Sequence, residues 1–199
     1  MAKLIFFYSA MKGGKSNILI PTAYNLKENN QRVMIIKPKM DTSGGKKIVS
    51  RSGAKADIDL WLEKEESFLS EKNLERIYQV DTMIIDEIQF LNRKQVEELW
   101  RITKELNIRV IGYGLRANFQ GNLFEGSKRL FELADEIKEL PIIPLCQCGE
   151  MAKFNARQVN GRYTMEGEEC IIKDSKQEIS YIPLCGKCFL EEVVFQNRE

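Results

Sequence analysis

The first chemically distinctive stretch of this chain is residues 9–16, which read Ser-Ala-Met-Lys-Gly-Gly-Lys-Ser. The segment ends in Gly14, Lys15 and Ser16 like a Walker A loop, although Ser9 stands where that pattern usually has its first glycine. Small residues let backbone N–H groups surround a phosphate, the lysine reaches phosphate oxygens, and the hydroxyl binds Mg²⁺. The segment therefore predicts a nucleotide site. The alternative is a glycine-rich turn with a chance Gly-Lys-Ser.

A pair of carboxylates comes much later in the chain. Residues 82–87 read Thr-Met-Ile-Ile-Asp-Glu, an apolar strand that ends in Asp86 and Glu87 as a Walker B strand does. Adjacent residues at a strand end point to opposite sides, so the two carboxylates can do different work. We expect Asp86 to hold Mg²⁺ through water and Glu87 to face the nucleophile. The alternative is a solvated acidic strand end.

Four cysteines form two close pairs. Cys146 and Cys148 are separated by one residue, and Cys185 and Cys188 by two. Two such pairs predict a tetrahedral Zn²⁺ site, and four protein ligands leave no open position for catalysis, so the ion should be structural. Disulfides are disfavoured because the chain looks cytosolic. Cys170 is left over and is expected to be a buried small residue or a free thiol.

Alternating strands and helices must position these residues. The apolar segments predict strands at residues 3–8, 32–37, 81–86 and 109–113, and helices over residues 17–29 and 94–106. This alternation predicts an α/β fold with a parallel sheet covered by helices on both faces. Pro21 is expected either to fit the first turn of its helix or to kink it. The polar segment 40–53 predicts a mobile hairpin rather than a core element.

The composition changes near Leu140, where prolines appear and most of the cysteines follow. We therefore expect a P-loop α/β domain at residues 1–142 and a small zinc-binding domain at residues 143–199. The loop after the strand at 109–113 lies at the sheet edge where ligands bind in parallel sheets. Three aromatic residues are candidates for stacking on a base, although each alone is more often a core residue: Phe90, Phe119 and Tyr181.

Composition excludes several classes of protein. The 199 residues carry 30 Lys and Arg against 29 Asp and Glu, a net charge of +1, so bulk charge does not call for nucleic acid or an anionic membrane. Histidine is absent, which excludes Ser-His-Asp and Cys-His catalysis. No apolar run approaches the roughly 18 residues of a membrane span, and no start resembles a signal peptide. We expect a soluble, cytoplasmic protein.

Together these motifs resemble the type II thymidine kinases, which are P-loop deoxynucleoside kinases with a zinc-bound lasso domain. The resemblance covers nearly the whole chain. It implies a parallel sheet flanked by helices, followed by a small C-terminal zinc-ribbon or lasso domain. Some bacterial members share both the Ser-Ala-Met opening and the C-x-C pair. The matching stretches are residues 8–16, 86–91, 113–119, 146–149, 166–168 and 181–188.

The resemblance also implies roles for individual residues. It makes Glu87 the general base, and Ser16 and Asp86 the residues near Mg²⁺. It places Asn155 near the base 5-methyl group and makes Tyr181 the lasso tyrosine that closes over the nucleoside. The implied ATP-binding residues are Ser9, Ala10, Met11, Lys12, Gly13, Gly14, Lys15, Ser16, Asp86, Glu87, Ile88 and Gln89. The implied nucleoside-binding residues are Met11, Phe90, Leu115, Phe119, Asn155 and Tyr181.

The chain departs from the family pattern at three places. Residues 171–180 contain no glycine, whereas the family usually has Gly-Gly before its lasso tyrosine. Ser43 lies near a position where arginine is common, and Asn118 stands where aspartate is common. A lasso without glycine cannot make the same positive-φ turn without strain, so we expect a different closed shape.

The predicted function is transfer of the γ-phosphoryl group of ATP to the 5′-hydroxyl of thymidine, and of deoxyuridine, in pyrimidine salvage for DNA synthesis. The resemblance implies Mg²⁺, structural Zn²⁺ and a homotetramer. One alternative is a zinc-ribbon nucleic-acid-binding ATPase, which the mixed charges after Cys146 disfavour. Another is a regulatory nucleoside-binding relative without catalysis, which the joint presence of Lys15, Asp86 and Glu87 disfavours.

Overall fold

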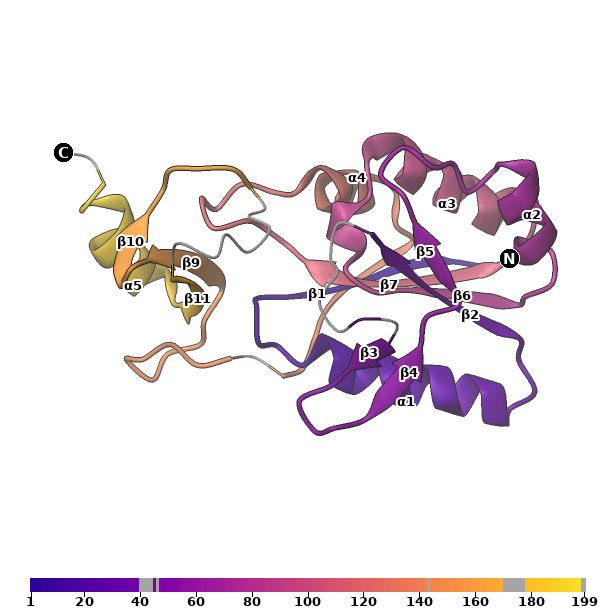
Figure 1. Ribbon diagram of the computed structural model, residues 1–199, viewed down its shortest axis with the longest axis horizontal. Coiled ribbons are helices and arrows are strands. Elements are labelled where there is room, and N and C mark those ends of the chain that lie inside the picture. Colours follow the sequence, from indigo (N-terminus) through magenta and orange to yellow (C-terminus); the bar gives the residue numbers. More distant parts are fainter. Residues whose placement is uncertain (40–44, 46, 143, 170–177, 198–199) are drawn as a thin grey trace.

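A six-stranded sheet dominates the computed structural model, which describes residues 1–39, 45, 47–142, 144–169 and 178–197 (Figure 1). The strand order is β5-β2-β6-β7-β1-β8, and every pairing is parallel. The strands are β1 (Leu4–Ser9), β2 (Val33–Pro38), β5 (Leu60–Leu62), β6 (Thr82–Ile85), β7 (Arg109–Leu115) and β8 (Glu136–Glu139). The predicted parallel sheet is therefore confirmed, and the four expected strands, β1, β2, β6 and β7, occupy its four interior positions.

Helices cover both faces of this sheet. One face carries α1 (Lys15–Glu28), and the other carries α2 (Glu71–Ile77), α3 (Arg93–Glu105) and α4 (Glu125–Leu133) (Figure 1). Leu19 of α1 packs in one buried apolar layer with Ile84 and Ile111, whereas Leu99 of α3 packs in the other with Phe6. Because alternate side chains of a strand point to opposite faces, each central strand contributes to both layers.

The sequence analysis missed the two edge strands, β5 and β8, for a physical reason. β5 has three residues, too few for a recognisable pattern. β8 reads Glu-Ile-Lys-Glu and is mostly exposed, so it lacks the apolar pattern by which a strand is recognised. Charged side chains are common on edge strands because they discourage pairing with other molecules. The two predicted helices occur, and each begins slightly earlier than expected, at Lys15 and at Arg93.

Pro21 lies inside α1, beyond its first turn. The first of the two expectations for this residue, accommodation in the first turn, is therefore wrong. A proline at this depth removes one helical hydrogen bond. The Thr22 hydroxyl on the same turn donates to the Ile18 carbonyl at 2.7 Å.

The predicted hairpin is present in part. Strands β3 (Lys47–Val49) and β4 (Lys55–Asp57) form a two-stranded antiparallel sheet beside α1, while residues 40–44 and 46 lie outside the described part of the chain. Ile48 is buried against the α1 layer. At the turn, an Arg51 guanidinium nitrogen donates to the Lys12 carbonyl at 3.4 Å. The hairpin therefore touches the glycine-rich loop.

A second, smaller sheet follows the α/β part (Figure 1). Its order is β10-β9-β11, with both pairings antiparallel, and the strands are β9 (Phe154–Val159), β10 (Arg162–Thr164) and β11 (Ile179–Leu184). The short helix α5 (Gly186–Cys188) and the π-helical turn η2 (Phe189–Val194) complete this part. It has its own apolar core around Ala156, Leu184 and Val193. The boundary between residues 142 and 143 stays a prediction.

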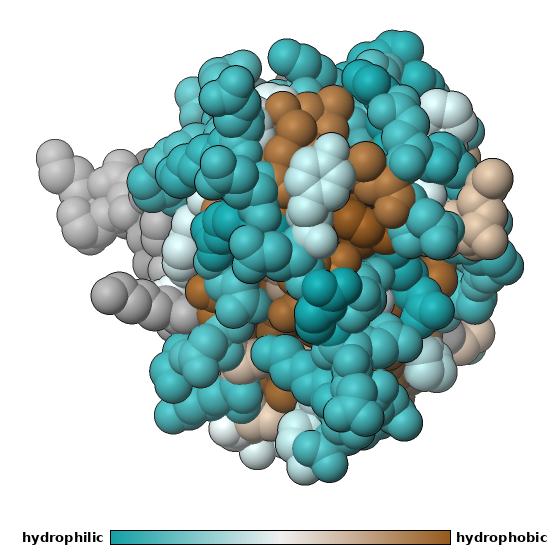
Figure 2. All heavy atoms as spheres, turned by 90° about the vertical axis from the view of Figure 1, so that its right-hand side faces the viewer, coloured by the Kyte–Doolittle hydropathy of each residue, from teal (hydrophilic) through white to brown (hydrophobic). Residues whose placement is uncertain are grey.

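The end of the molecule opposite the small sheet carries an apolar surface, brown in Figure 2. Between α2 and α3 there is a shallow hollow of about 270 Å³. Its lining residues are Leu69, Leu74, Tyr78, Arg101, Ile102, Glu105 and Leu106. Within the residues that the structure describes, no helix has both the length and the apolar character needed to cross a membrane.

Candidate active site

The glycine-rich loop connects β1 to α1 at the carboxyl edge of the large sheet. Ser9 is the last residue of β1, and Lys15 and Ser16 open α1. Gly14 caps the helix with a left-handed backbone, φ 74°. A Cβ atom on Gly13 would lie 2.5 Å from the Ser9 Cβ, so the serine that replaces the usual first glycine requires glycine opposite it.

The geometry and chemistry of this loop fit a bound phosphate. The amino end of α1, a helix of 14 residues, directs N–H groups and a partial positive charge toward the loop. The Ser9 hydroxyl is buried and has no hydrogen-bond partner among the described residues. A polar group in that situation is costly unless a ligand or water satisfies it. Lys15 adds an ammonium group with a side-chain exposure of only 11%.

Two carboxylates stand at the neighbouring strand end. Lys15 Nζ lies 3.6 Å from Glu87 Oε1, so the sheet brings the two sequence motifs together. Asp86, directly after β6, is buried with its Oδ2 atom 3.9 Å from the Nζ atom of Lys37 at the end of β2. The two neighbouring acids therefore face different lysines, and the different roles expected for them stay a prediction. Lys37 was not among the predicted site residues.

Glu87 is held in an uncommon conformation by a neighbour. Its backbone is left-handed, with φ 49°, and it leads into the 3-10 turn η1 (Ile88–Phe90). The Gln89 side-chain amide donates to Glu87 Oε2 at 2.6 Å, while its carbonyl oxygen accepts from the Leu115 backbone N–H at 3.0 Å. Gln89 thus connects Glu87 to the end of β7. Left-handed backbone at a non-glycine residue is often found at functional sites.

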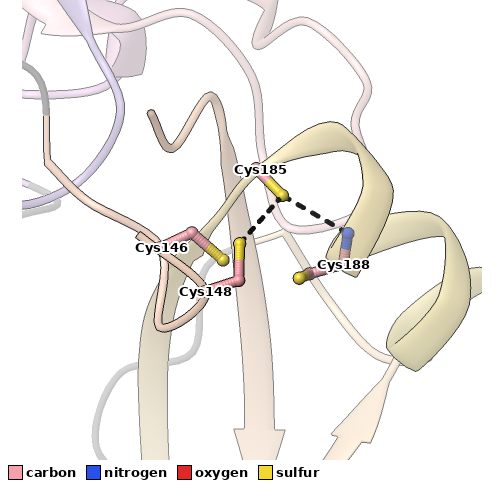
Figure 3. Close-up of side chains that lie close together, drawn as sticks. All are labelled: Cys146, Cys148, Cys185 and Cys188. Carbon is pink, nitrogen blue, oxygen red and sulfur yellow. Dashed lines mark hydrogen bonds between the residues drawn. The ribbon is translucent and has the colours of Figure 1, made fainter. Parts of the chain in front are cut away.

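The four cysteines meet beside the small sheet, two from the loop before β9 and two from α5 and its N-cap (Figure 3). Their sulfur atoms all lie within 4.8 Å of one another, and Cys148 and Cys185 Sγ are 3.7 Å apart. Sulfur ligands about 2.3 Å from a zinc ion in tetrahedral geometry have similar separations. Cys146, Cys185 and Cys188 are buried, whereas Cys148 is exposed. The donor set fits a zinc ion, and it would join the loop before β9 to the helix after β11.

The local environment already favours a thiolate at one of these positions. Burial raises the pKa of the Cys146 thiol, but hydrogen bonds from the backbone N–H groups of Cys148 and Cys185 outweigh it and lower the pKa to about 7. Hydrogen bonding with the other thiols, Cys148 first, raises the pKa of Cys188. A bound cation would relieve this competition, since zinc binds thiolates. Cys170 lies outside the described residues.

Comparison with known proteins identifies the family. The thymidine kinase family model matches residues 2–189 of this chain. The chain belongs to the thymidine kinase family. Thymidine kinase from Enterobacteria phage T4 is 40% identical over 189 residues, covering 94% of this chain and 95% of the relative. Those of Rhodopirellula baltica and Francisella tularensis subsp. tularensis are each 36% identical, covering 100% and 97% of this chain and 92% and 99% of the relatives.

Membership in the thymidine kinase family makes this chain a phosphotransferase. The family implies ATP, Mg²⁺ and a nucleoside substrate, and the cysteine cluster is compatible with zinc. It also favours the kinase interpretation over the nucleic-acid-binding ATPase that the zinc ribbon allowed. The parallel sheet brings the loop after β1 and the carboxylates after β6 together at one edge.

Asn155 connects the small sheet directly to the glycine-rich loop at residues 9–16. Its side-chain carbonyl accepts from the Met11 backbone N–H at 2.7 Å, and its amide donates to the Ala117 carbonyl at 2.9 Å. Asn155 is buried. Its amide therefore holds together β9, the loop after β1 and the loop after β7. The role that the resemblance implies for it, near the base 5-methyl group, stays a prediction.

The other predicted nucleoside-binding residues lie around the same loops. Leu115 and Phe119 are buried at and after the end of β7. Phe90 packs edge-on against Phe124, with ring centroids 5.7 Å apart. Tyr181 of β11 is half-buried and accepts a hydrogen bond from Arg157. Their role in nucleoside binding stays a prediction.

The departures from the family pattern have different outcomes. Asn118 donates to Glu169 Oε1 at 2.9 Å, a contact that aspartate would replace with two facing carboxylates. Ser43 and residues 171–177 of the lasso lie outside the described residues. The sequence analysis also missed Arg157, which contacts both Phe119 and Tyr181. No local pattern could have singled it out, because an arginine is usually a surface residue.

Proposed function

We propose that this chain transfers the γ-phosphoryl group of ATP to the 5′-hydroxyl of thymidine, and also accepts deoxyuridine. The observation that carries the proposal is the pairing of Lys15 and Glu87, 3.6 Å apart, between the phosphate loop and the end of β6. A cation for phosphate oxygens and a carboxylate for the acceptor hydroxyl must lie this close if one phosphoryl group is to pass between two substrates.

The loop at residues 9–16 would hold the phosphates of ATP through its backbone N–H groups. Lys15 would neutralise charge that develops on the transferred group, because its ammonium is shielded from water. Ser16 and Asp86 would hold Mg²⁺, which supplies charge neutralisation and orientation of the phosphate oxygens when bound. Lys37 would limit the net negative charge around Asp86.

Glu87 would act as the general base. Its carboxylate takes the proton from the 5′-hydroxyl while the oxygen of that hydroxyl bonds to the γ-phosphorus. The bond from the γ-phosphorus to the bridging oxygen breaks, and ADP leaves with the electron pair. Gln89 fixes the direction of the carboxylate, since it is anchored at Leu115 by its other end.

The small sheet would close the nucleoside side of the site. Asn155 supports this arrangement because it ties β9 to the phosphate loop and to the loop after β7. Exclusion of water would limit loss of the phosphoryl group to hydrolysis. Zinc on the four cysteines would be structural. The gathered free thiols also fit a reducing compartment, in agreement with the cytoplasmic location we propose.

A phosphoryl-transfer assay tests the proposal. Purified protein is incubated with Mg²⁺ and ATP labelled at the γ position, together with thymidine, deoxyuridine, deoxycytidine or no acceptor. We expect labelled thymidine and deoxyuridine monophosphates, with little label on deoxycytidine and little free phosphate. Hydrolysis without transfer would favour the nucleic-acid ATPase, and neither product would favour the regulatory relative. Light scattering tests the proposed homotetramer in the same preparation.

Substitution of the proposed base tests its role. Glu87→Gln keeps the size and the hydrogen-bonding capacity of the side chain but cannot accept the proton. We expect kcat to fall about 10²-fold or more, the usual contribution of general-base catalysis, while the affinity for ATP stays nearly unchanged. Glu105→Gln, which alters an exposed ion pair with Arg101, is the matched control. Near-normal turnover of Glu87→Gln would contradict the assignment.

A further inference from the structure

Arg157 is the largest fully buried side chain of the structure, and its position is unusual for an arginine. It lies in β9, the central strand of the small sheet. Burial of a guanidinium group is costly unless its charge and its N–H groups are compensated. Among the residues that the structure describes, no carboxylate forms an ion pair with it. A role in a conventional salt bridge therefore does not explain it.

Three segments provide part of this compensation, whereas the Nη1 atom of Arg157 is buried and has no hydrogen-bond partner among the described residues. Arg157 Nη2 donates to the main-chain carbonyls of Glu168 and Glu169, at 2.6 and 3.2 Å. Its Nε donates to the Tyr181 hydroxyl oxygen at 3.1 Å. Its Cζ atom lies 3.5 Å from the centroid of the Phe119 ring, so the guanidinium rests on that aromatic face. One side chain thus connects β9 to β11, to the loop after β7 and to the segment after β10.

The contact with Tyr181 has a chemical consequence. The two residues are opposite each other in the β9–β11 ladder, so the sheet itself keeps them in reach. Because Arg157 donates to the hydroxyl oxygen, the Tyr181 proton remains available for another acceptor. Among the described residues the Tyr181 hydroxyl donates to none. Arg157 therefore orients Tyr181 as a hydrogen-bond donor for a bound molecule.

The segment that Arg157 holds is also fastened at other points. The Gln120 amide donates to the Met165 carbonyl at 2.7 Å, and the Asn118 amide donates to the Glu169 carboxylate. Gly167 has a left-handed backbone, φ 101°, and a Cβ atom there would lie 3.2 Å from Arg157 Nη1. The chain therefore passes close over the guanidinium. Residues 165–169 are fixed from both sides, by the loop after β7 and by Arg157.

We propose that Arg157 is a positioning residue for the pyrimidine nucleoside, an inference that rests on the proposed function. It holds the Phe119 ring, the Tyr181 hydroxyl and the main chain at Glu168 and Glu169 in one arrangement around the base side of the pocket. It does not touch the reacting atoms, and no hydrogen bond joins it to the described residues of the phosphate loop. Its loss weakens nucleoside binding and leaves ATP binding intact.

Two substitutions separate charge from shape. Arg157→Met removes the charge and every N–H group, whereas Arg157→Lys keeps the charge but cannot reach three acceptors in one plane. Arg162→Met, which changes an exposed arginine of the neighbouring strand β10, is the matched control. We measure KM for thymidine and ATP, kcat, zinc per chain, and thymidine affinity by calorimetry. We expect the thymidine KM and Kd to rise about tenfold or more in Arg157→Met, with incomplete rescue in Arg157→Lys.

The same measurements define the results that overturn the proposal. An ATP KM that rises in parallel, or zinc lost from both variants, would make Arg157 a folding residue only. A thymidine KM within twofold of wild type in Arg157→Met would also overturn it, as would full rescue by lysine. Failure of the wild-type chain to phosphorylate thymidine would instead contradict the proposed function, while calorimetry would still report how each variant binds the nucleoside.

A double-mutant cycle tests the route through Tyr181. If Arg157 acts partly by orienting that hydroxyl, Tyr181→Phe and Arg157→Met remove overlapping contributions. We expect the increase in thymidine KM of the double variant to be clearly smaller than the product of the two single increases. If the increase in thymidine KM of the double variant equals that product, the two residues act independently, and this result would overturn the orienting role.

Discussion

At the scale of single residues, the proposed general base is a glutamate in an unfavourable backbone conformation. Left-handed φ at a non-glycine residue costs on the order of 1–3 kcal/mol and persists only where the surroundings impose it. Glu87 adopts such a φ between the buried strand β6 and the buried residue Ile88. The turn directs its carboxylate toward Lys15. Gln89 then fixes the second carboxylate oxygen.

This arrangement predicts the effect of changing Gln89. Gln89→Ala removes the donor to Glu87 and leaves the buried Leu115 N–H without its acceptor. We expect kcat to fall about tenfold, as for loss of a hydrogen bond worth about 1–1.5 kcal/mol, with little change in the ATP KM. Steady-state kinetics with Gln79→Ala, an exposed glutamine, as control provides the measurement.

A second substitution at the same position checks the physical reason. Gln89→Glu keeps the size but brings a second carboxylate against Glu87, so we expect kcat to fall further than in Gln89→Ala. An unchanged kcat in both variants would show that Glu87 does not need this support.

At the scale of elements, the strands β2 and β6 are joined at their beginnings by an exposed ion pair. Arg32 donates to both carboxylate oxygens of Asp81 through its side chain, and its backbone N–H donates to the same group at 2.9 Å. The side-chain hydrogen bonds from Arg32 lower the pKa of Asp81 from 3.8 to about 2. The folded state therefore binds this proton less readily than the unfolded chain does.

The direction of this shift predicts a pH dependence. The stabilisation is complete above the unfolded pKa and is lost as the pH falls through the folded value, about 2. We expect Asp81→Asn to be less stable than wild type at pH 7, and the difference to shrink as the pH falls below about 4. Denaturant unfolding of both proteins at several pH values between 7 and 3 measures it. A difference that stays constant over this range would contradict the linkage.

At the scale of the whole molecule, the chain contains cores of different kinds. The α/β part is held by two apolar layers on its sheet. The small part has a core of few buried residues, and these include Cys146, Cys185 and Cys188. A core of that size gains much of its stability from a metal ion. The two parts should therefore respond differently to removal of zinc.

Removal of zinc tests this difference. Both tryptophans of the chain, Trp61 and Trp100, lie in the α/β part, so their fluorescence reports on that part. We expect the zinc-free protein or Cys185→Ser to keep the fluorescence unfolding midpoint and ATP binding, and to lose thymidine phosphorylation. Metal analysis of the untreated protein should give one zinc per chain. Transfer that survives complete removal of zinc would contradict the coupling of the small part to the site.

The cysteine cluster and the candidate site could be proposed from the sequence because their signals are local. The glycine-rich loop is one contiguous segment, the two acids end one apolar strand, and the cysteines occur in two close pairs. The central strands were predictable for a similar reason, since burial on both faces makes them continuously apolar. The edge strand β8 was not, because its exposed positions are charged.

The sequence by itself determined the α/β class and the family, and it predicted the cysteine cluster and a nucleotide site made by the glycine-rich loop and the two acids. Only the tertiary structure showed that Asn155 binds the Met11 backbone, 144 residues away in the chain, and that Arg157 rests on Phe119 beneath the segment at residues 168–169. These contacts cannot be predicted from the sequence because every residue has a main-chain carbonyl and aromatic residues occur throughout the chain. Which of them a buried amide or guanidinium meets depends on how sheets and loops pack.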